Sequence, residues 1–166
     1  ELAGHAEMPS GARLRFATDA AALTVITEPL AEDGNFDLVI DNEIVATTAY
    51  EAGATQVAFT HLPSGDKTVE VWLSPAMPVA VRHLELPCGT TLEKSADTRL
   101  KWVTYGSSIT HCRSAGSPAT TWPGVVARGK NLNLTSMGYG GQCHADPLIT
   151  RLIRDRPADF VSVKIG

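Results

Sequence analysis

The last third of this chain carries the pattern that most restricts its fold: three short β-rich runs alternate with two segments of helical character. The runs are 100–105, 132–137 and 160–165, and a glycine follows each of them. A β-α-β-α-β succession builds a parallel sheet, because right-handed crossovers through helices return every strand in the same direction. Such sheets bind ligands at the carboxyl ends of their strands. We therefore expect an open α/β sheet with a ligand site at its glycine-bearing edge.

Two segments between these runs are predicted as helices. Thr121 can cap a short helix that ends near residue 130. Asp146 can cap a second helix, with Pro147 at its first position and Pro157 after its end. The apolar face of this second helix would be formed by Leu148, Ile149, Leu152 and Ile153.

Residues 12–87 follow a different pattern, in which short β-rich runs are broken by turn residues and no 3.6-residue apolar period persists. Seven strands are predicted, at 13–17, 23–27, 36–40, 44–48, 56–62, 68–73 and 79–86. Asp41-Asn42 favours a hairpin between the third and fourth strands, because both residues tolerate a positive φ. Seven short strands at this spacing predict an antiparallel β-sandwich. Trp72 and Phe59 should belong to its core rather than to a carbohydrate-binding platform.

The two regions also differ in charge, which supports two structural units. Residues 1–100 carry six basic and 15 acidic side chains, a net charge of −9, whereas residues 101–166 carry eight and three, a net charge of +5. We place a jelly-roll-like β-sandwich accessory domain at 1–95 and the start of an α/β domain at 96–166. The overall charge of −4 argues against a nucleic-acid partner. Charged residues interrupt every apolar stretch, so no membrane-spanning helix and no membrane partner are expected.

The cysteines give some indication of the compartment. Cys88, Cys112 and Cys143 are too few, and odd in number, for a disulfide framework. This favours a reducing compartment such as the cytoplasm, with secretion as the alternative. Because Glu1 stands where a translated chain would begin with Met, we expect a trimmed chain.

The turn after the first run of the α/β region holds a candidate nucleophile. Ser107 and Ser108 come directly after its glycine, at the open edge where a hydroxyl can reach a bound carbonyl. In the next turn, Gly140-Gly141 lets backbone amides approach a ligand as an oxyanion hole requires, and Gly166 ends the third run at the same edge. Considered separately, Gly-Ser-Ser is typical of an ordinary loop, and two consecutive glycines are typical of a tight turn with no catalytic role. Their convergence on one sheet edge favours catalysis.

Two of these turns resemble sequence blocks of the SGNH, or GDSL-like, hydrolase family. Residues 102–110, Trp-Val-Thr-Tyr-Gly-Ser-Ser-Ile-Thr, resemble its first block, and residues 136–142, Ser-Met-Gly-Tyr-Gly-Gly-Gln, its second. Residues 159–166 resemble the strand that leads into the third block, so the resemblance covers about residues 96–166. The segment 33–40, Asp-Gly-Asn-Phe-Asp-Leu-Val-Ile, is similar to the Gly-x-Asp-Leu segment of a β-sandwich domain that precedes some members.

The resemblance implies a flavodoxin-like α/β fold and a role for three residues. Ser108 matches the family's nucleophile, and its own N–H matches one oxyanion donor. Gly141 matches the second-block glycine that supplies another donor. Ser107 stands where the family usually has Asp. No metal and no organic cofactor are implied.

The resemblance also implies that the α/β domain is incomplete. The family's triad is completed by an Asp and a His near its C-terminus, and its third block has an Asn two places beyond the glycine that Gly166 matches. None of these is present in this sequence. We expect further chain of the same protein to pair beside residues 158–166 and to deliver the His and Asp.

Four other side chains near the two turns have alternative interpretations. His111 and His144 do not match the triad His, and we expect them, with Ser107, to line the mouth of the site beside the reacting groups. The pairs His111-Cys112 and Cys143-His144 could form a zinc site, but adjacent side chains diverge, whereas zinc ligands are usually spaced by two to four residues. A disulfide between Cys112 and Cys143 is a further alternative, and packing is the simplest one.

The sequence thus predicts a serine esterase that acts on a small acyl ester, of an acetylated carbohydrate or a natural product, through an acyl-enzyme on Ser108. An alcohol acceptor in place of water would make the same site an acyltransferase. The alternative outside enzymes is a carbohydrate- or protein-binding module.

Overall fold

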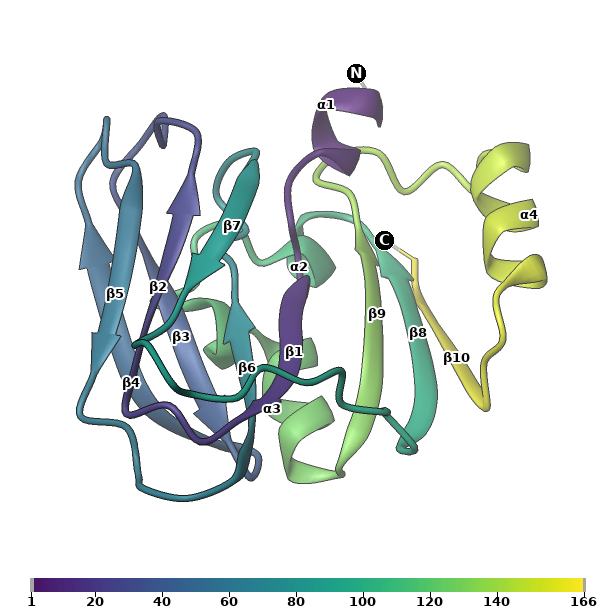
Figure 1. Ribbon diagram of the computed structural model, residues 1–166. Coiled ribbons are helices and arrows are strands. Elements are labelled where there is room, and N and C mark those ends of the chain that lie inside the picture. Colours follow the sequence, from purple (N-terminus) through teal and green to yellow (C-terminus); the bar gives the residue numbers. More distant parts are fainter. Residues whose placement is uncertain (1, 166) are drawn as a thin grey trace.

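The computed structural model describes residues 2–165, which form an antiparallel unit and a parallel unit side by side (Figure 1). The antiparallel unit, here called the β-unit, has two sheets with the strand orders β1-β6-β3-β4 and β5-β2-β7. The strands are β1 (Arg13–Thr18), β2 (Ala22–Thr27), β3 (Gly34–Ile40), β4 (Glu43–Tyr50), β5 (Gln56–Thr60), β6 (Lys67–Trp72) and β7 (Val81–Glu85). All seven lie where the sequence predicts strands, with ends that differ by up to two residues.

The two sheets of the β-unit share one apolar core. Phe36 and Leu38 of β3 belong to the same buried cluster as Leu23 and Val25 of β2. Phe59 is 2% exposed in this core, and Trp72 is 1% exposed but is buried in a second cluster, which the β-unit shares with the α/β-unit. The prediction that both residues are buried in a core is therefore confirmed, with Trp72 at the junction of the two units. Alternate side chains of a strand point to opposite faces, which explains why buried positions alternate with less buried ones along β2 and β5. Strands β3 and β6 are buried at consecutive positions, because the α/β-unit covers their other face.

The β3–β4 hairpin is formed by the turn that the sequence predicts. Asp41 and Asn42 have φ values of 51° and 66°, in the left-handed region that a two-residue hairpin of this kind requires. Strands β3 and β4 pair antiparallel from Gly34–Tyr50 to Ile40–Glu43. The hairpin prediction is therefore confirmed.

The second unit, here called the α/β-unit, is built on a parallel sheet of three strands. These are β8 (Leu100–Gly106), β9 (Leu132–Gly138) and β10 (Phe160–Lys164), in the order β10-β8-β9. Both pairs are parallel, in agreement with the predicted β-α-β-α-β pattern. Strand β8 is central, so the turns after β8 and β9 meet at the upper edge of the sheet in Figure 1.

Five helical segments accompany the strands: α1 (Leu2–Ala6), α2 (Ser108–His111), the 3₁₀ helix η1 (Pro118–Thr120), α3 (Trp122–Gly129) and α4 (Pro147–Asp155). Helix α3 begins as predicted, with the Thr121 hydroxyl accepting a hydrogen bond from the amide of Gly124 at 3.2 Å. The sequence did not predict α1, α2 and η1, because three to five residues are too few to show an apolar period. Within residues 2–165 no helix is long and apolar enough to span a membrane.

Helix α4 differs from its prediction in two ways. Asp146 stands at the N-cap position, but its side chain makes no capping hydrogen bond. Of the four residues predicted to form an apolar face, only Ile149 is buried, whereas Leu148 is 66% and Leu152 is 47% exposed. The reason is that α4 packs against the sheet through Ile149 and Ile153, and no other described element covers the rest of its apolar surface.

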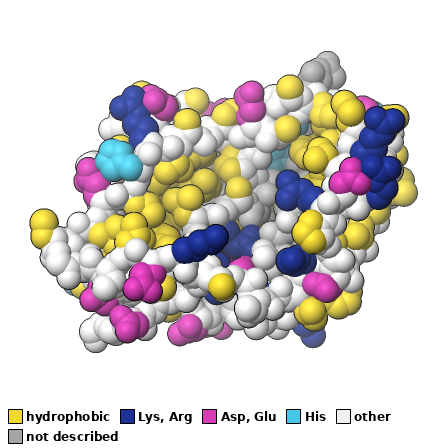
Figure 2. All heavy atoms as spheres, turned by 45° about the vertical axis from the view of Figure 1, so that its right-hand side comes forward, with side chains coloured by type: hydrophobic (Ala, Val, Ile, Leu, Met, Phe, Trp, Pro, Cys, Tyr) yellow, Lys and Arg dark blue, Asp and Glu magenta, His cyan; other side chains and the backbone are white. Residues whose placement is uncertain are grey.

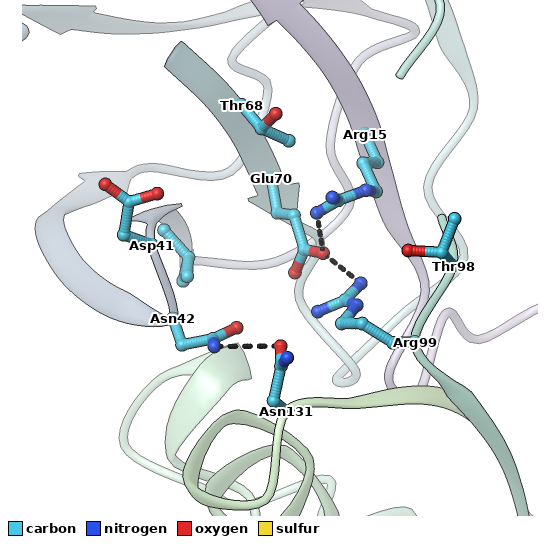
Figure 3. Close-up of a pocket in the computed structure, with 9 residues that line it drawn as sticks. Arg15, Asp41, Asn42, Thr68, Glu70, Thr98, Arg99 and Asn131 are labelled. Atoms are coloured by element: carbon cyan, nitrogen blue, oxygen red, sulfur yellow. Dashed lines mark hydrogen bonds and ion pairs between the residues drawn. The ribbon is translucent and has the colours of Figure 1, made fainter. Parts of the chain in front are cut away.

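A buried charged network joins the β-unit to the segment before β8 (Figure 3). Glu70 of β6 accepts a hydrogen bond from Arg15 at 2.9 Å and pairs with Arg13 at 3.3 Å. Arg99 contacts both Glu70 and Asp97. Burial by itself would raise the pKa of Glu70, but the charges of Arg13 and Arg99 outweigh it and lower that pKa. A hollow of about 270 Å³ lies beside the network and is lined by Arg15, Val39, Asp41, Asn42, Thr68, Glu70, Thr98, Arg99 and Asn131.

The two units also share apolar contacts. Val39 and Trp72 of the β-unit are buried in one cluster with Trp102 of β8 and Leu134 of β9. Arg13 donates to the carbonyl of Leu134 at 2.9 Å. The β-unit therefore covers one face of the parallel sheet.

Candidate active site

Ser107 and Ser108 lie at the carboxyl end of the central strand, as the β-α-β pattern predicts. Strand β8 ends at Gly106, Ser107 occupies the N-cap position of α2, and Ser108 is the first residue of that helix. A side chain at position 106 would collide with the Thr110 side chain, so the turn requires glycine. Ser108 is exposed and Ser107 is half-buried. The tight turn thus places the Ser108 hydroxyl at the surface.

The turn after β9 contacts the turn after β8 through a defined hydrogen bond. The amide of Gly141 donates to Ser107 Oγ, with an N–O distance of 3.1 Å. Gly141 has φ +71°, which a residue with a side chain rarely adopts. The amide of Ser108, at the first position of α2, has no acceptor within the helix. The Gly141 amide already donates to Ser107 Oγ. An oxyanion bound there would therefore accept this hydrogen bond in place of Ser107 Oγ or together with it.

His111 is held away from the surface. Its side chain is among the largest fully buried ones, and Nε2 lies 2.8 Å from the carbonyl oxygen of Pro75. Burial lowers the pKa of His111, so the neutral ring donates through Nε2 and leaves Nδ1 as an acceptor. The ring of His5 packs edge-on against the ring of His111, with 6.1 Å between the ring centroids. His111 therefore ties α2 to the β-unit beneath the site.

His144 lies in the segment between β9 and α4 and is exposed. The backbone amide of His111 donates to the carbonyl of Ser107 at 2.9 Å, as a helix turn requires. Among the hydrogen bonds of residues 2–165, none joins the side chain of His111 or His144 to either serine. Gly166, the third glycine of the predicted edge, lies outside the described residues.

The proposed zinc and disulfide arrangements are not formed. The Cys112 thiol donates to the Ile109 carbonyl at 2.9 Å, and all three cysteines are free. Burial raises the pKa of the Cys112 thiol, which keeps it protonated at neutral pH. Over the part of the chain that the structure describes, no three His, Cys, Asp or Glu side chains are grouped to hold a metal ion. The reason is that adjacent side chains diverge and His111 is turned towards Pro75.

An open hollow of about 430 Å³ lies beside Ser108, and the sequence did not predict it. Its lining residues are Ser108, Ile109, Cys112, Arg113, Ser114, Ala115, Thr120, Thr121 and Trp122. The indole N–H of Trp122 donates to the carbonyl of Ile109 at 2.8 Å, which fixes the ring against α2. The predicted cap at Thr121 placed Trp122 at the start of a helix. No sequence pattern indicated that Trp122 and Ser108 would line the same hollow.

Comparison with known proteins gives neighbours of solved structure. No protein-family model and no curated protein sequence matches the chain. The salicylyl-acyltransferase SsfX3 from a tetracycline biosynthetic pathway is 36% identical, with a TM-score of 0.88 over 96% of this chain and 49% of its own. A GDSL-like lipase from Bacteroides ovatus is 19% identical, with a TM-score of 0.79 over 98% of this chain and 53% of its own.

A family two carbohydrate esterase from Clostridium thermocellum, solved in complex with cellohexaose, is 14% identical, with a TM-score of 0.71 over 95% of this chain and 59% of its own. The chain thus spans about half the length of these neighbours. Below 25% identity the likeness concerns the fold alone. The structural neighbours of this mixed α/β chain are therefore GDSL-type esterases and, at 36% identity, an acyltransferase.

Proposed function

We propose that the protein is a serine-dependent ester hydrolase of the SGNH type and that Ser108 is its nucleophile. The observation that supports this best is the exposed Ser108 at the start of α2, in a turn that the Gly141 amide contacts through Ser107 Oγ. Ser108 Oγ attacks the acyl carbonyl and passes its proton to a base. The amides of Ser108 and Gly141 then stabilise the tetrahedral oxyanion. Loss of the alcohol leaves an acyl-enzyme, which water hydrolyses.

The general base is proposed to come from further chain of the same protein. His111 is buried against Pro75, and no hydrogen bond joins the exposed His144 side chain to either serine in the described residues, so we assign the base to neither of them. Strand β10 pairs with β8 on one side, and Phe160, Val161 and Val163 are each 51% exposed. An apolar edge strand is a template for another strand. A segment that pairs beside residues 158–166 would supply the His and Asp of the triad.

The proposed substrate is a small acyl ester, of an acetylated carbohydrate or a natural product. The carbohydrate esterases among the structural neighbours support the first and the salicylyl-acyltransferase the second. Transfer of the acyl group to an alcohol is the second candidate function, because the 36% identical neighbour is an acyltransferase. A non-catalytic binding module would require that Ser108 react with no acyl donor or inhibitor.

Labelling with a fluorophosphonate, followed by peptide mapping, tests the assignment of the nucleophile. The longest natural form of the protein should be labelled at Ser108, and Ser108→Ala should lose both labelling and ester turnover. The matched variant Ser107→Ala should keep labelling at Ser108, at a lower rate. Modification of Ser107, or unchanged turnover in Ser108→Ala, would refute the assignment.

A further inference from the structure

Strand β3 carries the segment that resembles an accessory-domain motif, and its two faces have different contacts. Phe36 and Leu38 point into the core of the β-unit, and both are 0% exposed. Asn35 and Asp37 alternate with them and therefore point to the opposite face. On that face they meet residues 116–119, which belong to the α/β-unit.

Asp37 is a buried acidic residue with one hydrogen-bond partner in each unit. It is 0% exposed, and its Oδ1 accepts a hydrogen bond from the Thr47 hydroxyl at 2.6 Å. Its Oδ2 accepts from the amide of Ala119 at 2.7 Å. The side-chain amide of Asn35 adds a bond to the carbonyl of Gly116 at 2.9 Å. A buried carboxyl group is costly unless it is hydrogen-bonded, so this arrangement is specific.

These contacts hold one wall of the hollow beside Ser108. Ala119 lies in the middle of η1, and the next three residues, Thr120, Thr121 and Trp122, line that hollow. Arg128 of α3 donates to the carbonyl of Ala119, which fixes η1 from its other side. Asp37 therefore lies behind the wall that faces the nucleophile, although it does not line the hollow itself.

The surface of the hollow next to Ser108 suits an apolar group. Ile109 is 56% exposed, and the Trp122 ring is held in place by its hydrogen bond to Ile109. Arg113, the charged residue of the lining, turns its guanidinium to Glu32 and to the carbonyl of Ala76. The Cys112 thiol is protonated and bonded to the Ile109 carbonyl. An aliphatic and an aromatic surface thus remain for contact.

We propose that this hollow receives the acyl group of the ester and selects apolar acyl groups larger than acetyl, with Asp37 of the β-unit as the positioning residue that sets its shape. Of the two proposed substrates, this selection favours the natural-product ester over the acetylated carbohydrate. The inference rests on the proposed function. The acyl group is assigned rather than the alcohol because the base must protonate the leaving oxygen. That base is proposed to enter along β10, so the alcohol should lie on the β10 side of Ser108. The hollow is formed by α2 and α3, which contact β9 on the other side of β8, and this position is left for the acyl group.

The test compares 4-nitrophenyl acetate, butanoate and benzoate as substrates of the longest natural form of the protein. We expect kcat/KM to rise from acetate to benzoate. Trp122→Ala should lower kcat/KM for benzoate about tenfold, mainly through KM, and change it for acetate less than about threefold, as loss of an aromatic contact predicts. Equal losses on all three esters in Trp122→Ala would overturn the assignment of the hollow.

Variants of Asp37 separate positioning from general stability. Asp37→Ala should reduce the ratio of kcat/KM for benzoate to kcat/KM for acetate, as Trp122→Ala does. Asp37→Asn should keep the ratio of the unmodified protein, because its amide oxygen can still accept a hydrogen bond from the Ala119 amide. Glu28→Gln, the same change at an exposed ion pair with Arg82, is the control and should leave the ratio unchanged. If Asp37→Ala does not fold, Asn35→Ala removes the neighbouring bond to Gly116 and should lower the ratio by a smaller factor. An unchanged ratio in folded Asp37→Ala or folded Asn35→Ala would overturn the positioning role.

A binding measurement distinguishes failure of this inference from failure of the proposed function. Titration with benzamide, a neutral acyl analogue, should shift the indole N–H resonance of Trp122 in a ¹H–¹⁵N spectrum, and acetamide should not. The resonance is assigned by its absence in Trp122→Phe. A shift of the resonance without turnover of any ester would support binding of the acyl group in the hollow and contradict the proposed esterase activity. Turnover without a shift would contradict the proposed role of the hollow.

Discussion

Strands β6 and β10 have similar compositions and opposite environments. Lys67–Trp72 is buried at its last four positions, whereas four of the five residues of Phe160–Lys164 are exposed. Strand β6 lies between β1 and β3 and takes part in closing a core with the second sheet, but β10 is an edge strand. Parallel sheets are normally covered on both faces. The comparison teaches that the β-unit closes its own core, while the α/β-unit leaves apolar surface open at β10.

The view in Figure 2 brings forward the side of the molecule that carries α4 and β10. Apolar and cationic side chains lie together on this side, and the exposed apolar residues are Leu148, Leu152, Phe160, Val161, Val163 and Ile165. This surface is where we place the further chain of the proposed enzyme. The following predictions test the contrast between the two units, from the largest effect to the smallest.

A lysine placed in β6 and in β10 should give the largest difference. Val71→Lys buries a charge with no partner at a position that is 0% exposed, and should cost more than about 4 kcal/mol of unfolding free energy. Val163→Lys, at a 51% exposed position, should change it by less than about 1 kcal/mol in residues 1–166. Chemical denaturation measures both. If the longer protein covers β10, Val163→Lys should be clearly more costly there, and an equal cost in both forms would contradict that covering.

Loss of the buried carboxylate at the junction of the units should have the next largest effect. Glu70→Gln removes the carboxylate that pairs with Arg13, Arg15 and Arg99, while Asp97 still pairs with Arg15 and Arg99. The change should cost about 3 kcal/mol, since breaking a buried ion pair leaves a buried charge uncompensated. Glu28→Gln, at an exposed pair, is the matched control and should leave the unfolding free energy unchanged. Similar losses in the two variants would show that the network does not hold the units together.

The same network should make stability depend on acid pH. The pKa of Glu70 is lowered in the folded state because the charges of Arg13 and Arg99 outweigh burial. Its contribution is therefore complete above its ordinary value of 4.5 and is lost as the pH falls through the lower folded-state value. Thermal unfolding followed between pH 3 and 7 should show a steeper acid limb in the unmodified protein than in Glu70→Gln. Parallel acid limbs would assign the pH dependence to other groups.

The smallest predicted contrast concerns the two helix caps of the α/β-unit. Thr121→Ala removes the hydrogen bond to the Gly124 amide and should cost about 1 kcal/mol. Asp146→Ala removes a side chain that makes no capping bond, and should change the unfolding free energy by less than about 0.5 kcal/mol. Urea denaturation of the two variants measures this difference. An equal cost would mean that Asp146 caps α4 in solution.

Patterns of neighbouring residues determined much of the fold. The period-2 runs of the β-unit, the Asp41-Asn42 turn and the Thr121 cap each depend on backbone preferences that act over a few residues. The β-α-β-α-β order likewise determines that β8, β9 and β10 are parallel, because crossover handedness leaves little choice. Ser108 at the end of β8 follows from the same local order.

Contacts between residues distant in the chain could be decided only by the tertiary structure. The bond from Gly141 to Ser107, the burial of His111 against Pro75 and the contact of Asp37 with Ala119 join residues 34 to 82 positions apart. No local pattern indicates such pairs, because each depends on how the β-unit packs on the parallel sheet. The exposure of Leu148 and Leu152 has the same origin: a helix's own period defines an apolar face, but only a neighbouring element can bury it.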